Sequence, residues 1–510
     1  MANAQVIRCQ TLDGRPVEFV NDIIGSGAMK DVYFSPDKSY VVCFFSKEKN
    51  KFYESKADYE RQKDRLREIT GNKWQGIFQS AGGDYWKRIF CWPDGLLEYN
   101  GLLGITAPTY QKHFFFQHGS KNNDFLNIKG KEKEGKWFAS ANNQNRFLDP
   151  QERGTWLNYL KIGILISRAV RRMHAAGLAH SDLSYKNILI DPVTGQACVI
   201  DVDGLVVPGK YPPDVVGTPD FIAPEVVKTS HLAKDDPKRH LPNIATDRHA
   251  LAVLIYMYLL YRHPLRGGKV HDVDDPQRDE SLTMGEKAVF VEHPDDASNR
   301  INLKQVKPSY LPWADTSKVP FGVTGPYLKA LFLQSFVTGL HNPAQRPSAN
   351  DWETALVKTV DLIQPCHNPD CAQKWYVFDN TTKPSCPFCG TPFKGKLPVL
   401  NLYSSRREGN YRPDNHRLMV WTGQSIYQWH ANSMIAPNER LTAEQTRRVG
   451  YFVFHQDIWW LVNENLPDLM DVATKTPVPI GGKIELTDGK QILLSKQDGG
   501  RLVVVQMVQG

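Results

Sequence analysis

One loop of the sequence reads His180-Ser181-Asp182-Leu183-Ser184-Tyr185-Lys186-Asn187, directly after a helical pattern that ends near Gly177. It places the carboxylate of Asp182 and the amide of Asn187 five residues apart. This pair suits phosphoryl transfer, because the carboxylate orients and deprotonates an incoming hydroxyl while the amide oxygen binds a metal ion on the phosphates.

Three other segments stand in a fixed order around this loop. An apolar run, residues 197–200, leads into Asp201-Val202-Asp203-Gly204, which offers a second carboxylate for the same metal. Residues 217–225 then read Gly-Thr-Pro-Asp-Phe-Ile-Ala-Pro-Glu. Far upstream, residues 24–33 read Ile-Gly-Ser-Gly-Ala-Met-Lys-Asp-Val-Tyr, where small residues let backbone N–H groups approach phosphates.

In this order and spacing the segments resemble those of the eukaryotic-type protein kinases, over about residues 20–360. The resemblance implies a bilobal kinase fold that uses ATP and Mg²⁺ to phosphorylate serine and threonine hydroxyls of a protein substrate. In that scheme Asp182 accepts the hydroxyl proton, Lys186 reaches the transferring phosphate, and Asn187 and Asp201 bind Mg²⁺.

The resemblance also locates the nucleotide. ATP is expected beneath the glycine-rich loop, with Ile24, Gly25 and Gly27 as binding residues, and against a hinge near residues 107–110. The lysine that pairs with the phosphates in this family is missing from the third strand, where Cys43 or Phe44 stands.

Lys30 occupies the place of the last glycine in the loop. Together with the cysteine in the third strand, this resembles the "with-no-lysine" kinases, in which a lysine from the neighbouring strand reaches the same phosphate site. We therefore expect Lys30 to be the phosphate lysine, with Lys47 as the next candidate. Its expected partner in the following helix is Glu60, with Glu54 and Glu68 as rivals.

Other differences from the family pattern concern how the activity would be regulated. Ser181 replaces the arginine that binds a phosphorylated activation loop, and residues 205–216 offer only Tyr211 for phosphorylation, so activity should not depend on such a modification. Asp203 stands at a glycine position of the family, where it either adds charge to the metal site or faces solvent. The resemblance further implies that Arg346 pairs with Glu225 and that Asp247 braces the catalytic loop, residues 180–187.

Four cysteines form two close pairs about fifteen residues apart: Cys366, Cys371, Cys386 and Cys389. Two such pairs can surround one tetrahedral ion, and the turn-forming residues around the second pair suit a zinc knuckle. We expect a structural zinc ribbon binding Zn²⁺; His367 can replace one ligand without making the site catalytic.

The remaining pattern predicts a multidomain α+β protein. Strands are expected at 17–24, 32–35, 40–45 and over 85–110, interrupted at Trp92-Pro93 and Gly101. A helix is expected at 57–69, and helical and loop segments from 150 to about 360. Residues 112–150, rich in lysine and asparagine, read as a solvated insertion. The predicted domains are a kinase N-lobe (1–110), a C-lobe with insertions (111–360), a zinc ribbon (361–396) and a small all-β domain (397–510).

The C-terminal strands, with a predicted hairpin at Asp488-Gly489, fit either a forkhead-associated-like sandwich or an OB-like barrel that regulates the kinase or recruits partners. The domain order resembles the kinase of bacterial tellurite-resistance-type phosphorylation modules. That likeness implies a phosphatase and a von Willebrand A-type protein as partners in bacterial signalling.

Composition and hydropathy limit the partners and the cellular location that we expect. The 510 residues carry a formal charge of +7, too small an excess to argue for nucleic acid as a partner. The apolar run from Ala250 to Tyr261 is shorter than the roughly 20 residues of a membrane span, and the N-terminus lacks the apolar stretch of a secretory signal, so we expect a cytoplasmic protein. Two alternatives stay open: an ATP-binding pseudokinase scaffold, and a kinase-fold enzyme acting on a small molecule.

Overall fold

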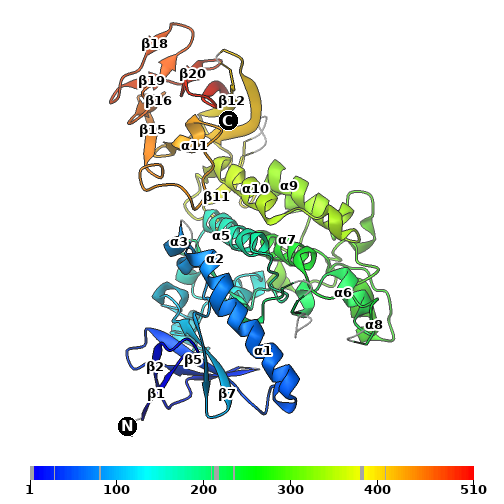
Figure 1. The fold of residues 1–510 in the computed structure, drawn as a ribbon. Coiled ribbons are helices and arrows are strands. Elements are labelled where there is room, and N and C mark those ends of the chain that lie inside the picture. The colour runs from blue at the N-terminus through cyan, green and yellow to red at the C-terminus, as the bar shows by residue number, and fades with distance from the viewer. Residues whose placement is uncertain are drawn as a thin grey trace. The chain divides into compact units, whose positions relative to one another are not determined.

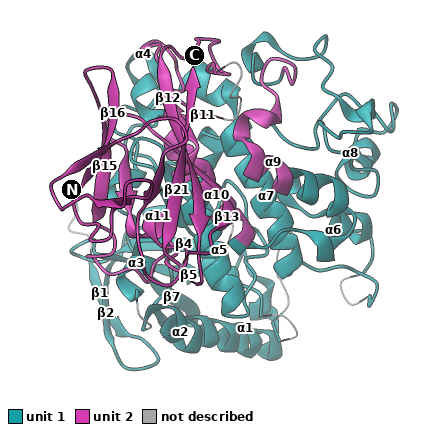
Figure 2. Cartoon of the chain, turned by 90° about the horizontal axis from the view of Figure 1, so that it is seen from above, with its two compact units in different colours: residues 1–154, 162–314, 332–350 teal, residues 155–161, 315–331, 351–510 magenta. Residues whose placement is uncertain are grey.

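The computed structural model describes residues 5–27, 29–79, 82–207, 210–211, 217–233, 236–378, 384–407 and 409–509. The chain divides into two compact units, coloured separately in Figure 2. Unit 1 comprises residues 1–154, 162–314 and 332–350, and unit 2 comprises residues 155–161, 315–331 and 351–510. Several segments of the predicted C-lobe thus group with the C-terminal region.

Unit 1 begins with antiparallel strands. A hairpin of β1 and β2 precedes a five-stranded sheet in the order β3-β4-β5-β7-β6, and β8 and β9 form a further hairpin. The bounds are β1 (Val6–Gln10), β2 (Pro16–Val20), β3 (Gly25–Ser26), β4 (Lys30–Phe34), β5 (Tyr40–Phe45), β6 (Gly95–Tyr99), β7 (Leu102–Pro108), β8 (Ile188–Asp191) and β9 (Gln196–Val199).

The two faces of the five-stranded sheet are covered differently. Helix α1 (Lys56–Glu68) packs Leu66 against Cys43 and Ile105 on one face, and Figure 1 shows the helix lying along the sheet. The β1–β2 hairpin packs Phe19 against Phe44 on the other face. Because side chains alternate along a strand, Cys43 and Phe44 of β5 point to opposite sides.

Residues 85–110 are only partly strands, contrary to the prediction for this stretch. Helix α3 (Gly83–Ile89) occupies its start, and β6 begins only at Gly95. Trp86 and Ile89 are buried three residues apart, which is a helical rather than a strand spacing.

The rest of unit 1 is mostly helical and irregular. Its helices are α2 (Trp74–Phe78), α4 (Lys121–Asp124), α5 (Trp156–Ala175, whose first turn belongs to unit 2), α6 (Pro224–Thr229), α7 (Ile244–Leu260) and α8 (Pro276–Met284). The apolar run that starts at Ala250 lies in α7, which begins with a capping box of Asn243 and Thr246 and is buried almost throughout. Among the described residues, no helix has the length and apolarity needed to cross a membrane.

The lysine-rich segment 112–150 is not wholly solvated. Lys133 is 2% exposed, and its ammonium lies 3.0 Å from Glu152 and 2.9 Å from Asp191. Glu152 also accepts hydrogen bonds from backbone N–H groups of residues 117–119. A buried lysine requires such partners, so this insertion is fixed to the β8–β9 hairpin by a buried ion network.

Unit 2 contains helices α9 (Pro326–Leu333) and α10 (Ala349–Asp361), the short pair β10 (Ile363–Pro365) and β11 (Trp375–Val377), and two larger antiparallel sheets. The six-stranded sheet has the order β13-β12-β21-β20-β17-β18 and the four-stranded sheet β14-β15-β16-β19. The bounds are β12 (Lys396–Ser404), β13 (Arg412–Met419), β14 (Ser425–Tyr427), α11 (Gln428–Ala431), β15 (Arg448–His455), β16 (Ile458–Asn463), β17 (Met470–Asp471), β18 (Thr476–Pro477), β19 (Lys483–Glu485), β20 (Gln491–Leu493) and β21 (Arg501–Gln509).

These two sheets enclose one apolar core, to which both contribute, for example Leu400 and Val503 from one and Phe452 and Leu461 from the other. The arrangement is a sandwich rather than a closed barrel. The predicted hairpin at Asp488-Gly489 is wrong in its pairing: the residues do form a turn, but β19 pairs with β16 and β20 with β21 and β17. The turn carries the chain from one sheet to the other, a long-range choice that local turn chemistry does not specify.

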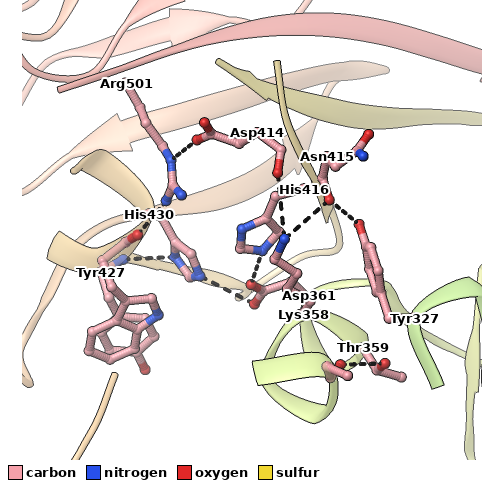
Figure 3. Close-up of polar contacts among 12 residues, drawn as sticks. Tyr327, Lys358, Thr359, Asp361, Asp414, Asn415, His416, Tyr427, His430 and Arg501 are labelled. Atoms are coloured by element: carbon pink, nitrogen blue, oxygen red, sulfur yellow. Dashed lines mark hydrogen bonds and ion pairs between the residues drawn. The ribbon is translucent and has the colours of Figure 1, made fainter. Parts of the chain in front are cut away.

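A buried carboxylate joins α10 to the sandwich. Asp361, at the end of α10, accepts hydrogen bonds from Nε2 of His416 (2.6 Å) and Nε2 of His430 (3.2 Å), both of which point toward it in Figure 3. The backbone N–H of Tyr427 donates to Nδ1 of His430, so the ring proton of His430 is on Nε2. Burial acts to raise the pKa of Asp361, but the two histidines outweigh it and hold the pKa below its ordinary value.

We predict that His416→Ala lowers the free energy of unfolding by about 1.5–3 kcal/mol, because it removes a hydrogen bond to a buried charged group. Urea unfolding followed by tryptophan fluorescence measures the change. His455→Ala, an exposed histidine of β15 in the same domain, is the matched control and should unfold like the native chain. Equal midpoints for the two variants would contradict this account of the cluster.

Acid should destabilise the protein through the same cluster. Burial lowers the pKa of His416 in the folded state below the value of about 6.5 for a free histidine. The unfolded chain therefore binds more protons as the pH falls below about 6.5, and stability decreases. His416→Gln keeps a donor toward Asp361 without a titrating ring, so its stability should fall less between pH 7 and pH 5 than that of the native chain.

Candidate active site and cysteine cluster

A cavity of about 440 Å³ lies in unit 1 next to the glycine-rich loop. Ile24 and Gly25 line it from the loop, and residues 107–110 line it at the predicted hinge. Asn187, Asp201 and Asp203 line it from the loop after α5 and the segment after β9. Its volume lies within the usual range for small-molecule sites, and apolar side chains combine there with a few polar groups.

The side chain of Asp182 is held from two sides. The amide nitrogen of Asn187 donates to its Oδ2 (2.9 Å) and to its backbone carbonyl (2.8 Å). The backbone N–H and hydroxyl of Thr218 donate to its Oδ1 at 2.7 and 2.9 Å. Because the amide nitrogen of Asn187 is bound to Asp182, its carbonyl oxygen is the atom left for a cation.

Two contacts expected from the resemblance are confirmed. Asp247, in the first turn of α7, accepts hydrogen bonds from the backbone N–H groups of His180 (2.7 Å) and Ser181 (3.1 Å). Arg346 binds Glu225 through both terminal nitrogens, at 2.8 and 2.7 Å. The bidentate pair fixes the start of α6, and Asp247 fixes the loop that carries Asp182.

Lys30 lines the cavity beside Asp201 and Asp203. Its ammonium is 2.9 Å from Oδ1 of Asp201 and 2.6 Å from Oδ1 of Asp203. Burial acts to lower the pKa of Lys30, but the two carboxylates outweigh burial and raise it. Burial raises the pKa of Asp203. Burial also acts to raise the pKa of Asp201, but the charge and hydrogen bond of Lys30, together with His180 and Asp203, outweigh it and lower the pKa.

The other strand positions are also resolved. Cys43 lines the cavity where the family lysine would stand, and burial raises the pKa of its thiol to about 12. Lys47 lies over the ring of Tyr53, 6.0 Å from its centroid, rather than in the cavity lining. Of the two lysines considered, Lys30 is the one at the cavity.

The structure does not bring Glu60 to Lys30. Glu60 is exposed on α1, whereas Gln62, Arg65 and Leu66 are the buried residues of that helix. The two rivals are elsewhere: Glu54 is exposed, and Glu68 lies 3.7 Å from Lys210. The charged residue that α1 turns inward is Arg65, which donates to the backbone carbonyls of Gly204 and Leu205.

Two residues of the candidate site have an uncommon backbone conformation. Ser181 (φ 67°) and Asp201 (φ 58°) both adopt the left-handed conformation, which is uncommon for residues other than glycine and tends to occur at functional sites. Lys186 is exposed and borders a neighbouring cavity of about 670 Å³ together with Tyr185 and Asp220. Of the segment 205–216, residues 208, 209 and 212–216 lie outside the described residues.

Sequence reasoning missed three contacts here: Asp203 with Lys30, Arg65 with residues 204 and 205, and Thr218 with Asp182. A signal for the first was present, since Lys30 and Asp203 each replace a glycine of the family pattern and carry opposite charges. Asn187, Asp201 and Asp203 offer amide and carboxylate oxygens, which are the kind of metal ligand that Mg²⁺ prefers.

The four cysteines of unit 2 meet as the sequence indicates. Their Sγ atoms all lie within 4.8 Å of one another, with Cys366 and Cys389 at 3.5 Å and Cys371 and Cys386 at 3.9 Å. A tetrahedral zinc with Zn–S bonds of about 2.3 Å requires S···S separations of about 3.8 Å. The cluster therefore fits a structural zinc; His367 packs on Phe393 instead of joining it.

Comparison with known proteins agrees with this site. Residues 138–351 match the family model described as "Protein kinase domain". The chain is 34% identical over 103 residues to the death-associated protein kinase dapk-1 of Caenorhabditis elegans, covering 19% of this chain and 6% of that protein. It is 30% identical over 73 residues to a dual serine/threonine and tyrosine protein kinase of Apis mellifera, covering 14% of this chain and 7% of that protein.

The matches thus span less than a tenth of either relative's length. Asp182, Asn187 and Asp201 all fall within residues 138–351, the part of the chain that matches the family model. The family match and the geometry around Asp182 together support a protein kinase domain in this part of the chain.

Proposed function

We propose that this chain is an ATP-dependent protein kinase that phosphorylates serine or threonine hydroxyls of a protein substrate. The observation that carries the proposal is that the fixed carboxylate of Asp182 is hydrogen-bonded to Asn187, which in turn lines one cavity together with Asp201 next to the glycine-rich loop. Phosphoryl transfer needs positioning and charge stabilisation more than covalent chemistry from the protein, and this grouping offers both.

Each group has a role in the proposal. Asp182 orients the substrate hydroxyl and accepts its proton, since Asn187 and Thr218 leave its side chain little freedom to turn. Asn187 and Asp201 would hold Mg²⁺, which supplies positive charge to the phosphate oxygens when bound. Lys30 neutralises phosphate charge in the manner of the "with-no-lysine" kinases, and the exposed Lys186 approaches the transferring phosphate. Ile24 and Gly25, which line the cavity, cover the nucleotide together with Gly27 of the same loop.

The finer assignments belong to the same proposal. Residues 1–110 and 111–360 act as the kinase lobes, 361–396 as a zinc ribbon and 397–510 as a partner-recruiting or regulatory domain. A cytoplasmic bacterial phosphorylation module with a phosphatase and a von Willebrand A-type partner is proposed from domain order alone. A pseudokinase scaffold is the alternative, favoured by the cysteine at the usual lysine position.

We predict that Asp182→Asn lowers phosphate incorporation from labelled ATP by about 10²–10⁴-fold, because the general base is removed while the size of the side chain is kept. Asp84→Asn, the same chemical change at an exposed position of α3, is the matched control and should retain native activity. Phosphoamino-acid analysis should find phosphoserine or phosphothreonine.

Two results would contradict the proposal that the chain is an active kinase. Equal incorporation in native protein and Asp182→Asn would remove the catalytic assignment. ATP binding without Asp182-dependent incorporation, in autophosphorylation and with added protein substrates, would favour the scaffold instead.

Metal analysis tests the ribbon. The native chain should carry about one zinc, and Cys386→Ser should lose most of it, because three thiolates hold the ion less well than four. Cys9→Ser changes a cysteine of β1 outside the cluster and should keep the metal. Native protein with far less than one zinc per chain, or full zinc in Cys386→Ser, would overturn the ribbon.

A further inference from the structure

Lys30 needs a fixed counter-charge if it is to hold phosphates. Its ammonium stands on a flexible four-carbon stem, so its position depends on the groups that bind it. In the kinases that this chain resembles, the notable feature is a lysine paired with a helix carboxylate, and the inward face of α1 offers none: Gln62, Arg65 and Leu66 are buried there, and Glu60 is exposed.

The two carboxylates that do bind Lys30 differ in exposure. The side chain of Asp201 is 54% exposed, whereas that of Asp203 is 11% exposed. Asp201 is thus open to another partner, and under the proposed function it is a metal ligand. Asp203 is enclosed, and its charge is compensated by Lys30 at 2.6 Å.

We propose that Asp203 is the positioning residue for Lys30, taking over the task that a helix glutamate performs in related kinases. This inference rests on the proposed function, since it concerns how the phosphate lysine is held. Both residues stand where the family pattern has a glycine: Lys30 at the last glycine of the loop, and Asp203 at the glycine two residues after the aspartate at position 201. Without Lys30 the enclosed carboxylate of Asp203 would lose its counter-charge, and without Asp203 the ammonium of Lys30 would keep only the more exposed Asp201.

Arg65 completes the arrangement. Its guanidinium donates to the carbonyls of Gly204 and Leu205, the two residues that follow Asp203. Helix α1 therefore supports the segment that carries the carboxylate, instead of supplying the carboxylate itself. In this arrangement the orientation of Lys30 depends on the Asp201–Leu205 segment and not on a Glu60 contact.

A double-mutant cycle tests the inference. Lys30→Met, Asp203→Asn and the double variant are compared with native protein for kcat, for KM of ATP, and for ATP affinity by calorimetry with Mg²⁺ present. Asp203→Asn should lower kcat/KM by about tenfold or more, and the double variant should be no worse than Lys30→Met, because a residue that acts through Lys30 has no effect once Lys30 is gone. Glu60→Gln and the surface control Asp84→Asn should stay near native values.

Several outcomes overturn the inference: multiplied losses in the double variant, native behaviour of Asp203→Asn, or a loss in Glu60→Gln. A raised Mg²⁺ requirement in Asp203→Asn that persists in the Lys30→Met background would make Asp203 a metal ligand instead. Circular dichroism checks that each variant is folded.

ATP affinity separates this inference from the proposed function. If the native chain binds ATP but transfers no phosphate, the catalytic proposal fails, and the double-mutant cycle is evaluated from ATP affinities alone. Non-additive losses of ATP affinity would then still support the pairing of Lys30 with Asp203. Absence of any ATP binding by the native chain overturns both.

Discussion

The ammonium of Lys30 between the carboxylates of Asp201 and Asp203 is the interaction on which the arrangement of the cavity depends. It joins the five-stranded sheet, through β4, to the segment that follows β9. Three charges in a partly enclosed space are stable only as a set, because burial penalises each one alone. The same contact makes the strand lysine Lys30 and the carboxylates of Asp201 and Asp203 one electrostatic unit.

Around this unit, neutral and paired contacts hold the reactive groups in place. Thr218 and Asn187 fix Asp182, Asp247 fixes the backbone of the loop, and Arg346 with Glu225 fixes the start of α6. Unit 2 uses the same principle away from the cavity, where Asp361 is buried between two histidines. In both places the fold encloses a carboxylate only where donors surround it.

Much of the candidate site could be predicted from local sequence motifs. The spacing of Asp182, Asn187 and Asp201 and the two cysteine pairs are encoded over short stretches, and the expected contacts of Asp247 and Arg346 follow from the family resemblance. The helix partner of Lys30 could not be predicted in the same way, because the sequence of a charged helix does not reveal which of its faces is buried. Arg65, and not Glu60, is the charged residue on the buried face of α1. Lys133 and the turn at Asp488-Gly489 depend on distant partners, β8 and β21, that no local pattern names.

A crystal structure of the chain with Mg²⁺ and a non-hydrolysable ATP analogue tests the central claim most directly. The account predicts one metal ion bound by oxygen atoms of Asn187 and Asp201, the terminal phosphate facing Asp182, and Lys30 in contact with phosphate oxygens. A cavity that stays closed to the nucleotide, or a nucleotide bound with these groups turned away from it, would contradict the account.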